Sequence, residues 1–253
     1  MDNGYEFIKI KNKDGLIAAI LLRWIQKGYI TFNKEETKKI LFFKVEGYSM
    51  DINESIPVEN EVEKEMLDYF IEASKGNGLL EEHEFESWCR TNYTLIESWF
   101  ESVEEYIELY YRNNQLLTTE ITYTEFIFKV KHDTDTFDVS IREKMEQILG
   151  LKKFLEEMSS INEKEVIEVK MWEEYLIFAS ILGIADKVEE QLGRLCPQFN
   201  EYSHMNTMHT THMIRHMTHS GVMASVSASQ GGGGSSSIGG GGGFSGGGGG
   251  GSR

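Results

Sequence analysis

The chain ends, from Gly231 to Arg253, in a segment of glycine and serine that offers almost nothing to bury. Fifteen of the 25 glycines of the whole chain lie between residues 231 and 252. Glycine loses more backbone entropy on folding than any other residue and brings no side chain to a core, so residues 231–253 are predicted to form a disordered, flexible tail. The residues that can fold are therefore those before about residue 200, a length that can bury a substantial core.

The beginning of the chain predicts a helix followed by a β-hairpin. Residues 14–27, DGLIAAILLRWIQK, favour a helix, and Gly28 is suited to end it. Two β-rich segments follow, at 29–32 and 40–45, and the charged residues between them predict an exposed hairpin tip. A helix and a hairpin in this order indicate a small α/β, winged-helix-like unit over residues 1–57.

Residues 58–199 predict a mainly helical domain with a central strand segment. Apolar residues spaced three and four apart predict helices at 58–74, 81–117, 140–158 and 162–195, and alternation predicts a strand at 121–131. Residues 200–230 are polar, rich in His, Met and Ser, and without a steady apolar period, so they are interpreted as a linker before the tail. The predicted fold class is therefore α+β, predominantly helical, with a disordered end.

Charge is distributed unevenly along the chain. The net charge is −16, and residues 1–48 carry nine Lys or Arg against six Asp or Glu. The body after residue 48 is therefore strongly acidic and repels nucleic acid and anionic lipid surfaces. Lysines at the expected hairpin tip leave a winged-helix nucleic-acid binder as an alternative, which the acidic body disfavours.

Two cysteines and the hydropathy of the chain bear on its location. Cys89 and Cys196 lie far apart, outside any C-x-x-C pair, which favours free thiols in a reducing compartment. The most apolar run, residues 175–185, falls short of the ~20 residues that a membrane-spanning helix needs. The start of the chain has no hydrophobic segment typical of a signal peptide. The chain is therefore expected to be soluble.

The segment 204–223 is the sharpest candidate site. It contains five histidines and five methionines. In a helix, His209, His212 and His216 share one face, and the spacing of His212 and His216 suits chelation of Zn²⁺, Cu²⁺ or Ni²⁺. Compositional bias in a linker explains the same residues without a metal, and the segment itself contributes no cysteine or acidic ligand. A metal site at His209, His212 and His216 is therefore one hypothesis.

Catalytic signatures are missing from the sequence. It has no phosphate-binding glycine loop outside the tail and no G-x-S-x-G motif. Its glutamate clusters alternate with aromatic residues, which is typical of solvated helix faces. The sequence therefore indicates a protein that is not an enzyme, and it implies no cofactor.

Three stretches resemble a known family. The sequence LGLKKFLEEMSSINEKEVIEVKMWEEYLIFASILGIADKVEEQL, residues 149–192, is similar to the C-terminal region of the YciQ-like predicted bacterial membrane proteins. The segment DGLIAAILLRWIQKGYITF resembles an earlier part of the same proteins, and the glycine–serine tail is similar to their ending. The resemblance implies a region of unknown function that follows a transmembrane helix and faces the cytoplasm, with no established enzymatic activity.

The leading hypothesis is thus a non-enzymatic interaction module at the cytoplasmic side of a bacterial cell membrane. The resemblance implies a protein partner at the membrane, although the chain as given contains no span. The metal-binding protein and the nucleic-acid binder are the alternatives.

Overall fold

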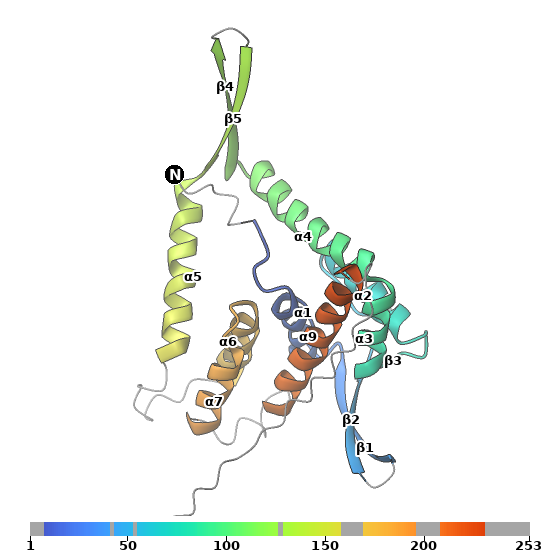
Figure 1. The fold of residues 1–253 in the computed structure, drawn as a ribbon. Helices are drawn as coiled ribbons and strands as arrows, with labels where there is room; N and C mark the ends of the chain where they lie inside the picture. The colour runs from blue at the N-terminus through green and yellow to red at the C-terminus, as the bar shows by residue number, and fades with distance from the viewer. Residues whose placement is uncertain are drawn as a thin grey trace, which may run out of the picture.

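The computed structural model describes residues 8–40, 43–52, 55–125, 129–157, 169–195 and 208–230, and the structural statements below concern these residues (Figure 1). The helices are α1 (Lys13–Gln26), α2 (Glu61–Ala73), α3 (Glu82–Thr91), α4 (Tyr93–Asn113), α5 (Val139–Glu157), α6 (Val169–Ile181), α7 (Ala185–Leu195) and α9 (Met208–Gln230). The strands are β1 (Thr31–Ile40), β2 (Phe43–Asp51), β3 (Leu79–Glu81), β4 (Leu117–Glu125) and β5 (Lys129–Phe137). The expected α+β, predominantly helical fold class is confirmed, and the tail lies outside the described residues.

Helix α1 is the centre of the core. Its buried residues surround most of its circumference: Gly15, Ile17, Ala18, Ala19, Leu21, Leu22, Trp24 and Ile25. A helix that is apolar on nearly all sides is covered on all sides, and α1 packs against both α6 and α9. The side chain of Asn12 caps its first turn by accepting a hydrogen bond from the backbone N–H of Gly15.

The first sheet differs from the predicted hairpin. Strands β1 and β2 pair antiparallel, and β3, which follows α2, pairs with β2 to give the order β1-β2-β3. The charged residues 33–39, expected as the tip, belong to β1, with a register shift between Glu35 and Lys38. The run of charged residues did not distinguish a turn from a strand, because an edge strand is as exposed to solvent as a turn. The winged-helix nucleic-acid alternative stays a prediction.

A second correction concerns the central strand segment. A single strand was expected at 121–131, whereas β4 and β5 form a two-stranded antiparallel hairpin that reverses between residues 125 and 129. This reversal lacks the Asn-Gly or Asp-Gly pair that marks a tight hairpin in sequence. The hairpin projects away from the helical body (Figure 1).

Two expected long helices are interrupted. The helix predicted over 81–117 divides at Asn92 into α3 and α4. The helix predicted over 162–195 divides between α6 and α7, where Gly183 has a φ of 71°. The backbone N–H of Ile184 then bonds the carbonyl of Ala179, which closes the last turn of α6. A positive φ is easy for glycine and costly for other residues, so Gly183 is the signal that the periodicity concealed.

The largest difference lies at the C-terminal end. The linker interpretation of residues 200–230 is wrong for residues 208–230, which form α9, a helix packed on α1, α3 and α4. Its buried face contains small, polar and apolar residues together: Thr210, Thr211, Ile214, Met217, Thr218, Gly221, Val222, Ala224 and Ser225. They repeat at helical spacing, but a pattern scored on large apolar residues does not detect them.

One hydrophobic core joins the parts of the chain. Buried residues of α1, α2, α3, α4, α6, α7 and α9 belong to a single cluster, so the segments before and after residue 57 share it. Trp24 and Trp99 are its largest fully buried side chains. The indole of Trp99 donates a hydrogen bond to the carbonyl of Val62 on α2, at 2.7 Å. Burial of the aromatic side chains therefore also fixes the position of α2.

Candidate functional site

The three histidines of the sequence hypothesis lie on α9. His212 and His216 are exposed, and the side chain of His209 lies outside the described part of the chain. The metal-ligand group that the described residues form contains His212 with two carboxylates of α7, not with His216. The three-histidine site therefore stays a prediction, while the structure brings His212 to new neighbours.

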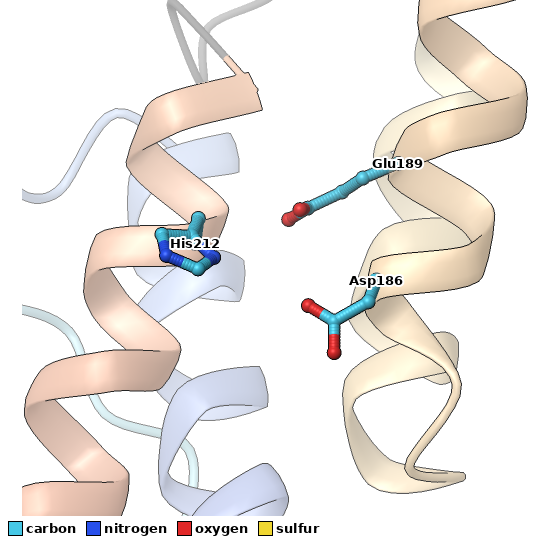
Figure 2. A group of neighbouring side chains, drawn as sticks. All are labelled: Asp186, Glu189 and His212. Carbon is cyan, nitrogen blue, oxygen red and sulfur yellow. The ribbon is translucent and has the colours of Figure 1, made fainter. Parts of the chain in front are cut away.

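Asp186, Glu189 and His212 face one point between α7 and α9 (Figure 2). One possible ligand atom from each residue lies within 4.8 Å of the other two. Asp186 and Glu189 are three residues apart, so both project from the same side of α7. The carboxylates and the imidazole come from helices joined by residues 196–207, and folding is what brings them together.

Glu189 is the unusual member of this group. Its side chain is only 7% exposed, and its Oε1 has no hydrogen-bond partner among the described residues. Burial raises the pKa of Glu189 to about 7, partly opposed by the nearby Arg215 and increased by Asp186. An orphaned buried acceptor costs about 1–3 kcal/mol, which a ligand at this oxygen could offset.

Arg215 is the positive charge of the site. Its guanidinium forms hydrogen bonds from both Nη atoms to the two carboxylate oxygens of Asp186, and the Nη2–Oδ2 distance is 3.0 Å. The hydrogen bond from Arg215 keeps the pKa of Asp186 below its ordinary value, despite partial burial. This ion pair connects α7 to α9. Nearby on α9, His219 Nδ1 lies 3.0 Å from Asp14 Oδ2 of α1.

The two acidic residues were missed because they lie outside the histidine-rich segment. The sequence nevertheless carries a signal for one of them. In α7 the apolar residues Ala185, Val188 and Leu192 form the buried stripe. Glu189 is four residues after Ala185 and three before Leu192, so helical geometry places this carboxylate within the stripe. A charged residue at such a position indicates a functional or paired group.

A second feature is an apolar groove, here called the α4–α5 groove. It has a volume of about 660 Å³ and lies among the segment before α1, α4, α5 and the end of α6. Its apolar lining includes Ile10, Val103, Ile107, Met145, Ile148 and Ile181. Three lysines also line it, Lys9, Lys11 and Lys152, and no Asp or Glu does so among the described residues.

The groove continues into a smaller hollow. This second hollow, of about 340 Å³, lies over Trp99, and Leu16, Val103, Ile107 and Ile181 line both spaces. Its rim includes Tyr106, which is 44% exposed. Ligand pockets typically enclose about 300–1,000 Å³ and are mainly apolar. The joined hollows thus have the size and lining of a binding site.

The described residues include no activated thiol. Cys89 is fully buried on α3, and burial raises its pKa to about 12. A thiol of this kind is protonated at neutral pH and packs as a small apolar side chain. Cys89 therefore contributes to the core.

Comparison with known proteins gives one partial match. Residues 126–192 match a family model described as the C-terminal domain of a predicted membrane protein family, DUF2207. The matched range contains α5, α6 and the greater part of α7, with Asp186 and Glu189. Over that range, the match supports a relation to this family of predicted membrane proteins. No curated protein and no solved structure matches the chain.

The length and hydropathy of the helices decide whether any of them can cross a membrane. Among those that the structure describes, none combines the length and the hydropathy needed to cross a bilayer.

Proposed function

We propose that this chain is a non-enzymatic interaction module and that its α4–α5 groove binds an amphipathic helix of a protein partner at the membrane. The family match, to a domain of a predicted membrane protein, supports the setting. The resemblance to YciQ-like proteins supports the bacterial cell membrane and its cytoplasmic side. The observation that carries the proposal is the groove itself, because its apolar lining is open to solvent.

The groove suits a helix better than a bilayer. Proteins that lie on a membrane insert protruding apolar groups, whereas this surface is hollowed. An amphipathic helix places residues at i, i+3, i+4 and i+7 into such a groove. The chain also carries a net charge of −16, which repels anionic lipid.

The lining also indicates the charge of the occupant. Lys9 and Lys152 both line the groove and come from different elements, the segment before α1 and α5. In a strongly acidic protein, this local positive charge favours a helix with acidic residues beside its apolar face. The proposed occupant is therefore an amphipathic helix with glutamate or aspartate on its flanks.

Labelled helical peptides provide the test. Two peptides with the same leucine face carry either glutamate or lysine on the flanks of that face, and fluorescence anisotropy measures their binding to the full chain. The glutamate peptide is expected to bind at least ~10-fold more tightly than the lysine peptide, because only the former complements the lysines. Equal affinities would contradict the proposed charge of the occupant.

Two substitutions locate the binding. Ile148→Glu places a charge in the groove and is expected to weaken binding of the glutamate peptide ~10-fold or more. The control is Ile121→Glu on β4, where the wild-type side chain is 49% exposed and outside the groove. Binding that survives Ile148→Glu would reject the groove as the site.

The proposed location at a membrane is tested with lipid vesicles and in native cells. If the chain sediments with phosphatidylglycerol vesicles and Ile148→Glu releases it, the occupant is the bilayer and the helix is rejected. A photo-cross-linking amino acid at position 148 in native cells is expected to give an adduct with a membrane protein, which position 121 does not give. Adducts with soluble proteins only would contradict the membrane setting.

A further inference from the structure

Helices α7 and α9 place two carboxylates and one imidazole around a common point (Figure 2). From this geometry we infer a binding site for a divalent transition metal, with Asp186, Glu189 and His212 as its ligands and Zn²⁺ as the cation it fits. The site is independent of the α4–α5 groove. It shares only His212 with the three-histidine hypothesis.

The buried carboxylate is the observation that points to a ligand. Glu189 is more than nine-tenths buried, its Oε1 is unpartnered among the described residues, and its side chain extends toward His212. Acidic side chains are rarely buried without a partner because ionised groups lose their hydration there. A cation supplies that partner, and the exposed His212 and Asp186 complete its coordination from the solvent side.

The spacing is compatible with one ion after a small adjustment. Zinc bonds of about 2.0–2.2 Å to oxygen and nitrogen place tetrahedral ligands ~3.5 Å apart. The present ligand atoms all lie within 4.8 Å of one another, so no pair needs to approach by more than ~1.3 Å. Rotation of the exposed His212 side chain can provide this movement, because exposed side chains change rotamer readily.

The donor set selects among cations. Imidazole suits Zn²⁺ and other late transition metals, whereas Ca²⁺ and Mg²⁺ favour all-oxygen ligands. Three protein ligands leave a fourth tetrahedral position for water. Zinc is therefore expected to bind and calcium is not.

Arg215 tunes the affinity of the site. Each carboxylate oxygen has two lone-pair positions, so Asp186 can accept from Arg215 and still offer a lone pair to a metal. The guanidinium charge nevertheless repels a cation a few ångströms away. Removing this charge is expected to tighten zinc binding, the opposite of the effect of removing a ligand.

Zinc would connect two parts of the core. Helix α9 packs on α1 and α3, and α7 packs on α6. In the absence of metal, the described contacts between α7 and α9 include the ion pair of Arg215 with Asp186. A bound zinc adds a second, stronger connection between α7 and α9 and stabilises the packing of α9.

The test is calorimetric titration of the full chain with ZnCl₂, together with the midpoint of thermal unfolding. Wild-type protein is expected to bind one Zn²⁺ and to unfold at a higher temperature with zinc, but not with CaCl₂. Glu189→Gln and His212→Ala are expected to weaken zinc binding ~10-fold or more. Glu190→Gln is the matched control, because that neighbour is exposed and paired with Arg194.

Three results would overturn the site. If Glu189→Gln leaves the zinc affinity unchanged, Glu189 is not a ligand and the proposed site loses its central member. Loss of binding in a His209→Ala/His216→Ala double variant, with retention in Glu189→Gln, would assign the metal to the histidine face of α9. Arg215→Gln is expected to raise the zinc affinity, and a decrease in a protein that circular dichroism shows to be folded would contradict the geometry.

Discussion

Gly221 of α9 faces the ring of Phe85 on α3 so closely that a Cβ added to Gly221 would lie 2.7 Å from Cε1 of that ring. The same Cβ would lie 3.2 Å from the sulfur of Cys89. Carbon atoms pack at about 3.5–4.0 Å, so this position has no room for a methyl group. The absence of a side chain at Gly221 is what lets α9 lie on α3.

Gly221→Ala is therefore expected to destabilise the protein, although alanine favours helix more than glycine does. The clash should lower the free energy of unfolding by ~1–3 kcal/mol, measured by urea denaturation. The control is Gly150→Ala in α5, where an added Cβ meets nothing within 4 Å. That substitution is expected to raise stability by ~0.5–1 kcal/mol, and a loss at Gly150 as large as at Gly221 would contradict the packing argument.

Asn12 connects the start of α1 to the end of α6, and both halves of its amide are used. Its Oδ1 accepts from Gly15 N at 3.2 Å, while its Nδ2 donates to the carbonyls of Ser180 at 2.6 Å and Ile181 at 3.2 Å. Asn12→Asp keeps the helix cap but places a carboxylate against those two carbonyls. We expect it to lower the free energy of unfolding by ~1–3 kcal/mol.

A matched substitution isolates the role of the Asn12 amide nitrogen. Asn60 caps α2 through Oδ1, which accepts from Glu63 N at 2.8 Å. Asparagine and aspartate cap helices about equally well, so Asn60→Asp should change stability by less than ~0.5 kcal/mol. Equal losses at the two positions, measured by urea denaturation, would show that capping alone explains both.

Glu84 of α3 is expected to make the stability of the protein depend on pH, through its bonds to Lys75 and Glu81 between α2 and α3. Burial disfavours its ionised form, but the hydrogen bonds from Lys75 Nζ at 2.8 Å and from Glu81 N at 3.1 Å outweigh burial and lower the pKa of Glu84. Because the folded pKa lies below the unfolded value of about 4.3, this stabilisation is complete above that pH. It is lost as the pH falls through the folded pKa.

Glu84→Gln is expected to lower the free energy of unfolding by about 1 kcal/mol at pH 7 and to have less effect at low pH. Urea denaturation between pH 7 and 3 measures both quantities. Glu86→Gln is the control, because its pair with Arg90 is on the surface. A cost of Glu84→Gln that is constant across this range would contradict the lowered pKa.

Large apolar residues made much of the fold predictable. The helix of residues 14–27 was expected from its leucines, isoleucines and Trp24, and α1 occupies nearly this range as the buried centre of the core. The apolar spacing of residues 81–117 has a polar gap at Asn92, which was included in one predicted helix although α3 ends there. The break at Gly183 was hidden, because apolar spacing continues across it. A periodic pattern records which residues face a core, but it does not record a change in helix direction.

Helix α9 was missed for a chemical reason. Hydroxyl side chains can be buried in a helix when they bond a carbonyl of the preceding turn, and Thr218 bonds Arg215 O at 3.1 Å while Ser225 bonds Val222 O at 2.7 Å. Such residues count as polar in a sequence pattern but act as small core residues here. The position of Glu189 in the apolar stripe of α7 is visible in the sequence, but its proximity to His212 is not, because Asp186 and Glu189 belong to another helix.

The position of α9 along the chain has a consequence for folding during synthesis. A ribosome releases the N-terminus first, so α1 and α3 emerge well before the helix that covers them. Until residues 208–230 are released, the apolar faces that they cover are open to water and to other proteins. Closure of the core thus depends on contacts between residues about two hundred positions apart, such as His219 with Asp14, and pairings of this range form slowly. The nascent chain therefore passes through a long interval in which chaperones can bind those faces.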